Sequence, residues 1–458
     1  MLFSSLEFIF LFLPVALITY YVTPKRFKNF ILFILSVLFY AFGEIRLLPI
    51  FLLTVFASYI FGIIVGRCKR KGAKRAVLIL SIAFNLSFLI YFKYFDFLRT
   101  AIFGKDPLGI LLPIGISFYT FQAISYVADV YRGNVAYTKN FITFGTYISL
   151  FPQLIAGPIV KYSDVERQLC NRDCSVSQVA SGIRIFICGL AKKVILANSA
   201  GATFESFIDS SSFLSAFLCI FFFGMQIYFD FSGYSDMAIG LGRMFGFEFP
   251  KNFDYPYISR SVSEFWRRWH ITLSSFFREY VYIPLGGSRC SKARLVFNLC
   301  IVWCLTGIWH GAAWNFLLWG VYFAVLLIAE KLFLNKLLQK IPLVFARVYS
   351  LFFIFLGWLI FASDKVTLSF GDGLSIFSRL FFVGAESLVT QSELYLVLGL
   401  LPFIFILCIG STPIPRRIYC FFCNKISVLS TVISIFGFII SVAYITGAGY
   451  NPFLYFRF

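Results

Sequence analysis

Long apolar runs separated by short polar stretches extend from one end of the chain to the other. About 20 residues of helix cross the hydrocarbon core of a bilayer, because each residue advances the helix by about 1.5 Å. Runs of this kind begin near Leu6, Asn29, Leu47, Ala76, Ile110, Phe141, Phe213, Leu295, Ala313, Leu343, Leu394 and Val428. Because the runs at Leu295 and Ala313 are consistent with one broken unit, the pattern predicts about 11 spans.

These runs are expected to form helices, since lipid offers no partners to the backbone and only helices or closed barrels cross it. The long continuous runs exclude a barrel, which would show short segments of alternating polarity. Hydrophobic residues make up 60% of the chain and charged residues 13%, whereas a soluble domain is about half apolar and about a quarter charged. We therefore expect an all-α, polytopic membrane helix bundle, folded as a single domain over residues 1–458.

The polarity of the chain varies along this domain. We distinguish N-terminal helices (1–98), a core (110–335) and C-terminal helices (342–458), with polar connectors near 104–109 and 161–182. Residues 228–294 combine many aromatics with Asp230, Asp236, Arg243, Lys251, Asp254, Arg260, Glu264, Arg267, Arg268, Arg278 and Glu279. Interfacial or re-entrant helices suit this mixture. Asp230, Ser232, Tyr234 and Asp236 could line a substrate path. Helix capping and buried ion pairs with residues such as Arg243 are the favoured alternative.

The positive charge of the chain predicts its orientation in the membrane. The net charge is +19, and basic residues cluster after the first span (25–28) and between the third and fourth spans (67–75). These clusters are two spans apart and therefore lie on the same face, which is cytoplasmic by the positive-inside rule. These clusters therefore predict an extracytoplasmic N-terminus. Topology explains the charge better than nucleic-acid binding does.

Only two histidines occur in the chain, and each lies in a tryptophan-rich block. Histidine is the side chain best suited to gaining and losing a proton near neutral pH. Ser261 and Glu264 have the spacing of a capping box, so a helix is expected to begin at Ser261 and to continue through His270. Its apolar face would carry Trp266, Trp269, His270, Leu273, Phe276 and Phe277. Arg267 would lie beside His270, and this cation together with burial favours the neutral imidazole.

His310 ends an almost uninterrupted apolar run. A helix through it would align Trp303, Gly307, His310 and Trp314 on one stripe, and Gly307 and Gly311 have the spacing that permits close helix approach. The run from 294 to 330 is too long for one straight span, so a break near Gly311 is expected. A buried ionisable residue is a functional candidate. The alternative for either histidine is a packed polar residue that bonds a neighbouring helix.

Several sequence blocks resemble the membrane-bound O-acyltransferase family, specifically its alginate O-acetyltransferase branch. They follow one another over most of the chain as Pro113–Gln122, Phe151–Pro158, Tyr228–Asp236, Asn252–Pro256, Glu264–His270, Tyr282–Gly287, Gly307–Gly311 and Asn451–Phe456. The chain departs from many members at Tyr322 and Phe323, where those members carry a further histidine, and at Ala362, where they carry an arginine.

The resemblance implies a bundle around a central tunnel that moves an acyl group from a cytoplasmic thioester to a hydroxyl. His310 matches the catalytic histidine and His270 the supporting catalytic position. The substrate-binding residues that we expect are Trp266, Arg267, Trp309, Trp314 and Asn315. Trp303 would also wall the tunnel, whereas Arg267 and Arg268 either attract donor phosphates or serve the structure. Acetyl-CoA is the expected donor and a carrier-protein thioester is the alternative, with no bound cofactor and no metal.

The expected partners are membrane lipid and either an extracytoplasmic acetyltransferase of the SGNH type or polysaccharide-export machinery. Two other classes of function remain open from the residues alone. A transporter or flippase would use the polar segment as its substrate site, but its inverted repeats are not visible in the sequence. A bis-histidine haem or metal protein would need ligands that face each other, and no third ligand is evident.

Overall fold

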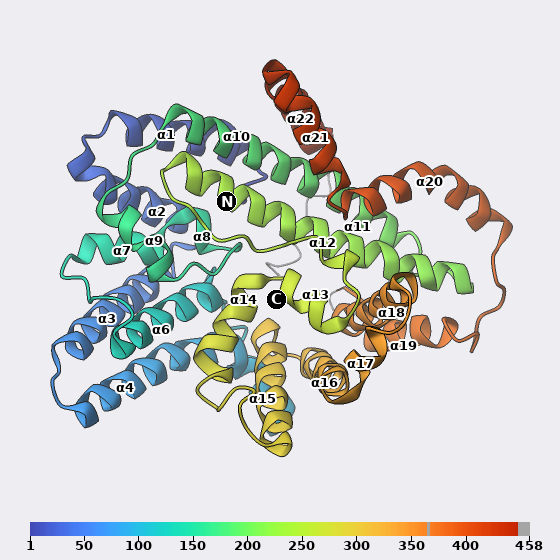
Figure 1. The fold of residues 1–458 in the computed structure, drawn as a ribbon, viewed down its shortest axis with the longest axis horizontal. Coiled ribbons are helices and arrows are strands. Elements are labelled where there is room, and N and C mark those ends of the chain that lie inside the picture. Colours follow the sequence, from blue (N-terminus) through green and yellow to red (C-terminus); the bar gives the residue numbers. More distant parts are fainter. Residues whose placement is uncertain (364–366, 448–458) are drawn as a thin grey trace. The chain divides into compact units, whose positions relative to one another are not determined.

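The computed structural model describes residues 1–363 and 367–447, and every regular element in these ranges is a helix (Figure 1). Nine of the described helices are long and apolar enough to cross a membrane: Lys25–Glu44, Leu48–Arg67, Lys71–Phe103, Phe213–Met244, Lys292–His310, Trp314–Leu338, Leu343–Ala362, Gln391–Gly410 and Val428–Gly447. The shorter apolar helix Phe8–Val22 brings the described chain into rough agreement with the predicted count. The all-α, multi-pass class is confirmed. The block Asn451–Phe456 lies outside the described residues.

One compact unit consists of residues 1–187, 234–251 and 278–280. Its helices are α1 (Leu13–Val22), α2 (Lys28–Glu44), α3 (Leu48–Arg67), α4 (Lys71–Leu89), α5 (Phe95–Phe103), α6 (Ile116–Arg132), α7 (Phe141–Ser149), α8 (Phe151–Leu154), α9 (Tyr162–Cys170) and the beginning of α10 (Val176–Ala191). Helix α6 is buried along almost its whole length, including Gln122 and Asp129. It is therefore a core helix of this unit.

Two expectations for this unit are wrong. The apolar run at Phe141 forms only α7, whose nine residues are too short to cross a bilayer. Most of α7 is buried against protein, which explains an apolar run that does not face lipid. Residues 161–182, expected as a polar connector, contain α9 and the start of α10. Helix α9 is amphipathic, with only Tyr162, Val165 and Leu169 buried. Its mean hydropathy is therefore low, which is why the segment was expected to be a connector and not a helix.

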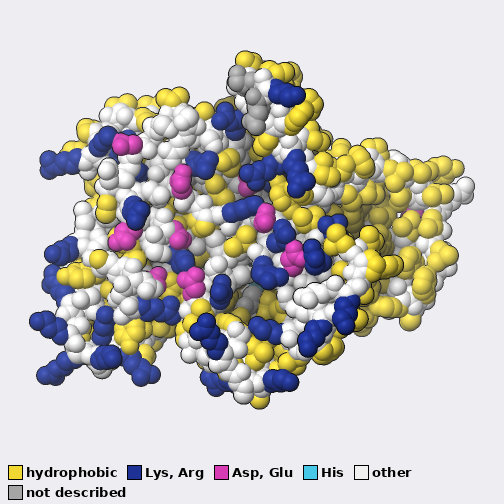
Figure 2. All heavy atoms as spheres, in the orientation of Figure 1, with side chains coloured by type: hydrophobic (Ala, Val, Ile, Leu, Met, Phe, Trp, Pro, Cys, Tyr) yellow, Lys and Arg dark blue, Asp and Glu magenta, His cyan; other side chains and the backbone are white. Residues whose placement is uncertain are grey.

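The other unit consists of residues 188–233, 252–277 and 281 onward. It holds a π-helical turn (Lys192–Ala197), α11 (Asn198–Glu205), α12 (Phe213–Met244) as far as Gly233, α13 (Val262–Arg268), α14 (Ile271–Phe277), α15 (Lys292–His310), α16 (Trp314–Ala329), α17 (Asn335–Leu338), α18 (Leu343–Ala362), α19 (Phe370–Arg379), α20 (Gln391–Gly410), α21 (Ile414–Lys425) and α22 (Ser427–Gly447). Hydrophobic side chains dominate the surface of α20 in Figure 2, and Leu398, Leu401 and Phe405 are among its exposed residues. Such a surface suits contact with lipid.

Helices α15 and α16 pack along each other as a hairpin (Figure 1). The predicted break is confirmed, because α15 ends at His310 and α16 begins at Trp314. Gly307 and Gly320 let the two backbones touch: a Cβ atom on Gly307 would lie 2.3 Å from the carbonyl oxygen of Phe316, and one on Gly320 would lie 2.4 Å from that of Trp303. This close approach fixes the end of α15, where His310 is located.

The single helix that was predicted through His270 is wrong. Ser261 does cap α13, since its hydroxyl accepts a hydrogen bond from the Glu264 amide at 3.0 Å. The helix then ends at Arg268, and α14 begins at Ile271. His270 lies between them with a φ of +41°, a left-handed conformation that no α-helix accommodates. The expected apolar face is therefore divided between two short helices.

Candidate active site

Asn252 fixes the backbone and the ring of His270. The Asn252 carbonyl oxygen accepts a hydrogen bond from the Ile271 amide at 2.9 Å, and its side-chain oxygen lies 3.0 Å from Nδ1 of His270. That side-chain oxygen also accepts from the amide and the hydroxyl of Thr272, at 3.3 and 2.9 Å. A left-handed histidine is strained and persists only where the surroundings determine it strongly. Asn252 provides much of that restraint.

These contacts determine the tautomer of His270. A backbone amide can only donate, so the Asn252 side-chain atom that faces the Thr272 amide is the oxygen, Oδ1, and not the nitrogen. The His270 nitrogen that faces the same oxygen must then be a donor, and Nδ1 carries the proton. The lone pair is on Nε2, which becomes the proton-accepting nitrogen. Burial lowers the pKa of His270 to about 3, so the imidazole is neutral near neutral pH, as expected.

The cause of this neutrality differs in part from the expectation. Desolvation lowers the pKa of His270, whose side chain is 1% exposed. Arg267, expected beside the ring, is exposed to the surroundings instead. Because the helix ends at Arg268, the three-residue spacing no longer places the two side chains on one face. The prediction about Arg267 was therefore wrong in its geometry.

His310 is buried among aromatic rings at the end of α15. Its ring centroid lies 5.0 Å from those of Trp309 and Trp319 and 5.3 Å from that of Phe361. As the last residue of α15, it lies where the helix presents its partially negative carbonyl end. The carbonyl groups there give the end of a helix a partial negative charge.

Trp309 is a neighbour of both histidine rings. Its indole contacts the His270 ring at a centroid distance of 6.0 Å and the His310 ring at 5.0 Å. Six of the seven tryptophans, all within the described residues, are buried in this unit: Trp266, Trp269, Trp303, Trp309, Trp319 and Trp358. Such a cluster excludes water from its interior, which strengthens every polar interaction inside it.

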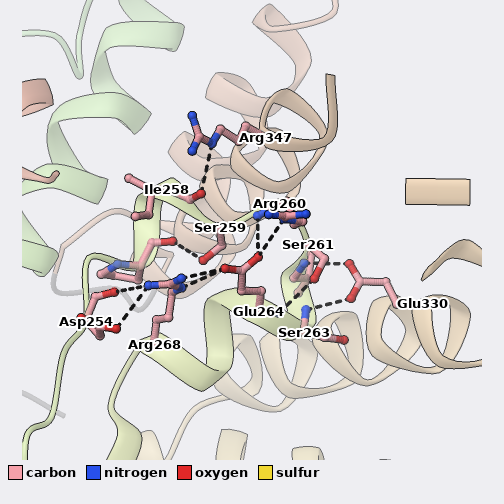
Figure 3. A network of polar contacts seen from close by, with 12 residues as sticks. Asp254, Ile258, Ser259, Arg260, Ser261, Ser263, Glu264, Arg268, Glu330 and Arg347 are labelled. Carbon is pink, nitrogen blue, oxygen red and sulfur yellow. Dashed lines mark hydrogen bonds and ion pairs between the residues drawn. The ribbon is translucent and has the colours of Figure 1, made fainter. Parts of the chain in front are cut away.

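A polar network holds α13 in place beside this cluster (Figure 3). The buried Glu330 carboxylate accepts hydrogen bonds from the amides of Val262 and Ser263, at 2.7 and 2.8 Å. An anion at this position also interacts favourably with the helix N-terminus. Arg268 pairs with Glu264 at 2.9 Å and with Asp254 at 3.2 Å. The segment that leads to His270 is thus anchored at its start and at its end.

Electrostatics in the network keep Glu264 ionised. Partial burial raises the pKa of the carboxyl, but hydrogen bonds from the Arg260 amide and from Arg268 more than offset this and leave the pKa below its usual value. The Glu264 side chain reaches the amide of Arg260 at 3.1 Å, one residue before the cap. Arg268 thus forms ion pairs with both the Glu264 and the Asp254 carboxylates.

The remaining predicted substrate-binding residues lie in different settings. Trp266 is buried and contacts Trp303 and Trp319, at 4.7 and 5.4 Å between ring centroids. The Asn315 side-chain amide donates to the carbonyl of Phe361 at 3.1 Å and so ties α16 to the end of α18. Trp314 is 64% exposed. It does not share a stripe with His310, because α15 ends before it.

Sequence reasoning gave no role to Asn252, Trp319, Phe361 or Glu330. Asn252 and Trp319 carried a signal, since the first belongs to the block Asn252–Pro256 and the second lies nine residues after His310 in a tryptophan-rich run. Phe361 follows an ordinary apolar run, and Glu330 is an isolated acid at the end of another. Their contacts depend on the tertiary packing of distant helices.

Comparison with known proteins identifies relatives of this sequence. Residues 37–369 match the model of the MBOAT, membrane-bound O-acyltransferase family. The chain is 39% identical to the protein named probable alginate O-acetylase AlgI of Azotobacter vinelandii, over 82% of this chain and 78% of that protein. It is 36% identical to the protein of the same name from Pseudomonas putida, over all of both chains. It is 34% identical to peptidoglycan O-acetyltransferase of Helicobacter pylori, over 80% of this chain and 78% of the relative.

Proposed function

The chain belongs to the membrane-bound O-acyltransferase family and is a multi-pass membrane O-acyltransferase, and we propose that it moves an acetyl group from cytoplasmic acetyl-CoA toward an extracytoplasmic hydroxyl. The observation that carries this proposal is the pair of buried imidazoles, His270 and His310, that contact one indole, Trp309. Two proton-accepting groups in a water-poor aromatic site suit transfer between a thioester and an alcohol.

His310 acts as the general base. It takes the proton from the acceptor hydroxyl while that oxygen attacks the carbonyl carbon of the thioester. The bond between carbon and sulfur then breaks, and the imidazolium returns the proton to the leaving thiolate. The carbonyl end of α15 stabilises the imidazolium between these two steps. No proton is gained or lost over the cycle.

His270 orients the acceptor hydroxyl or relays its proton. Its Nδ1 donates to Asn252, so the neutral ring offers Nε2 as a hydrogen-bond acceptor. An acceptor nitrogen binds a hydroxyl hydrogen and cannot donate to the oxyanion of the tetrahedral intermediate. Orientation of the hydroxyl and relay of its proton therefore fit the tautomer of His270, whereas donation to the oxyanion does not.

The aromatic cluster protects the thioester from hydrolysis. Water that reached the activated carbonyl would compete with the acceptor hydroxyl, and the buried tryptophans around both histidines limit its entry. Trp266 and Trp309 line the reacting region in this proposal. The donor enters through a central tunnel, with Arg267 attracting its phosphates, since Arg267 is exposed whereas Arg268 is engaged by Glu264 and Asp254.

The acceptor is a hydroxyl of an exported polysaccharide, reached directly or through an extracytoplasmic acetyltransferase of the SGNH type. The relatives named for alginate and for peptidoglycan O-acetylation support the polysaccharide class. We place the N-terminus on the extracytoplasmic side of the bacterial cytoplasmic membrane, as the basic clusters at 25–28 and 67–75 predict.

Inverted membrane vesicles from the native host provide the test. [1-14C]Acetyl-CoA is supplied outside the vesicles, and alkali-labile label is measured on luminal polysaccharide and on protein. We expect labelling with the wild type, background with His310→Ala, and wild-type labelling with Cys420→Ser, an exposed position on α21. Full labelling by a folded, normally inserted His310→Ala variant would refute the proposed base. Label on protein that chases onto polysaccharide identifies the two-step route.

A further inference from the structure

We propose that a buried ion pair between Lys193 and Asp230 positions His270 for the reaction, acting through Phe231. The inference rests on the proposed function, because it assigns this pair a role in the transfer that His270 supports. Asp230 was expected to pair with a residue such as Arg243. The structure pairs it with Lys193 instead, and Arg243 donates to the Ser181 hydroxyl at 2.8 Å.

The ion pair is enclosed within the protein. Nζ of Lys193 lies 2.9 Å from Oδ1 of Asp230, and the two side chains are 1% and 3% exposed. The same ammonium donates to Oδ1 of Asn198 at 2.8 Å. Asp230 belongs to α12, which is long and apolar enough to span the membrane. Charges in such a place interact strongly, because neither water nor salt screens them.

Lys193 belongs to the π-helical turn Lys192–Ala197, which interrupts the helix between α10 and α11. Such turns insert one extra residue and often occur at functional sites. One turn after Asp230, Gly233 brings α12 against this segment: a Cβ atom there would lie 2.7 Å from the carbonyl oxygen of Gly189 and 3.0 Å from the amide nitrogen of Lys193. The ion pair and this backbone contact together fix the rotation of α12 about its axis.

Phe231 connects that rotation to the active site. It follows Asp230 directly on α12, and its fully buried ring meets the His270 ring edge-on, at a centroid distance of 4.7 Å and an interplanar angle of 85°. The Phe231 ring also contacts the ring of Phe253, the residue that follows Asn252, at a centroid distance of 5.0 Å. Phe231 therefore supports both His270 and the segment that holds its Nδ1. A rotation of α12 would withdraw this support.

The strained backbone of His270 gives the support its importance. A histidine at a φ of +41° keeps that conformation only while several contacts enforce it. Asn252 acts on one nitrogen and on the adjoining backbone, and Phe231 acts on the ring. Packing alone does not require charges behind Phe231, since a buried ion pair can often be replaced by apolar residues without loss of stability. A directional, unscreened bond instead holds α12 at one angle.

The double variant Lys193→Met/Asp230→Leu separates positioning from packing. It removes both charges of the pair; Met is unbranched like Lys, and Leu branches at Cγ like Asp. We expect it to fold and to show kcat reduced at least tenfold, with KM for acetyl-CoA within twofold of the wild type, because His270 is displaced while the donor still binds. Its matched control is Lys161→Met/Glu279→Leu, which removes the partly exposed ion pair of 2.9 Å in the other unit and should leave kcat unchanged.

Two further variants keep the proposal open to refutation. The charge exchange Lys193→Asp/Asp230→Lys should recover more activity than either of its single substitutions. Phe231→Leu leaves the ion pair intact and removes the ring that contacts His270. It should also lower kcat without raising KM. This variant provides the test if the apolar double variant does not fold. Wild-type kcat in a folded apolar double variant, or in Phe231→Leu, would overturn the inference. If those variants keep wild-type kcat while His310→Ala is inactive, only the inference about the ion pair fails and the proposed function stands. Transfer by His310→Ala would instead refute the proposed function.

Discussion

Asn252 and His270 are joined by a hydrogen bond of 3.0 Å that assigns the proton to Nδ1 of the imidazole. A neutral amide partner leaves the ring uncharged, and burial lowers its pKa to about 3. Replacing the amide by a carboxylate changes that balance, since an opposite charge at hydrogen-bond distance favours the imidazolium.

We therefore expect Asn252→Asp to raise the pKa of His270 and to move the acidic limb of kcat/KM to higher pH. Protonated His270 has no lone pair on Nε2, so activity would be lost at a pH where the wild type is still active. Thr272→Val is the control, because it removes one hydrogen bond to the Asn252 side chain without adding charge. An acidic limb of Asn252→Asp that coincides with that of the wild type would contradict the contact between residue 252 and His270.

The buried, neutral His270 should also make stability depend on pH. Its pKa is lower in the folded protein, about 3, than its usual value of 6.5, so the unfolded chain binds the proton more readily. The free energy of unfolding should fall as pH decreases through 6.5, by up to about 1.4 kcal/mol per unit until about pH 3.

His270→Asn isolates this contribution, because asparagine tolerates a left-handed backbone and does not titrate. The stability of the wild type relative to this variant should decrease between pH 7 and pH 4 when both are unfolded in detergent. A relative stability that is constant over this range would mean that His270 is not held neutral in the folded state.

Close packing between α15 and α16 predicts a steric defect at Gly320. A Cβ atom there would meet the carbonyl oxygen of Trp303 at 2.4 Å, so Gly320→Ala must push α15 away from α16. We expect a loss of about 1–3 kcal/mol in stability and a lower kcat, since His310 moves with α15. Gly399→Ala on α20 is the control, because nothing lies within 4 Å of its new methyl group. Equal melting temperatures for the two variants would argue against this packing.

The cap on α13 predicts graded effects at Glu330. Its carboxylate accepts from the amides of Val262 and Ser263, so Glu330→Ala leaves one buried and one half-buried donor unsatisfied and should lower stability by about 1–3 kcal/mol. Glu330→Gln retains one acceptor oxygen and should lose less. Glu386→Ala removes an exposed carboxylate that binds Ser211 and should be nearly neutral. Thermal unfolding of the purified variants would rank them, and a ranking with Glu386→Ala lowest would be inconsistent with the cap.

Local signals in the sequence predicted the features that depend on neighbouring residues. The apolar runs indicated helices of membrane length, Ser261 indicated the start of α13, and Gly311 with two alanines indicated the end of α15. Each of these depends on backbone propensity or on the length of a bilayer, which are properties of a short segment. The same holds for the neutral charge of His270, which requires only that the residue be buried.

Features that depend on distant residues could not be predicted. The left-handed backbone of His270 depends on Asn252, and no propensity of the segment 261–279 indicates a break there. The run at Phe141 is apolar because it contacts protein, and hydropathy does not distinguish that from contact with lipid. Lys193 was not recognised as the partner of Asp230, because the two are 37 positions apart.

The indole of Trp309 has a consequence for how substitutions combine. Because the Trp309 ring contacts both imidazoles, replacing either histidine changes the packing of an indole that the other histidine also contacts. Effects of paired replacements at His270 and His310 should therefore be non-additive, with the second loss smaller than it is alone. A double-mutant cycle on His270 and His310 would measure the coupling that Trp309 provides.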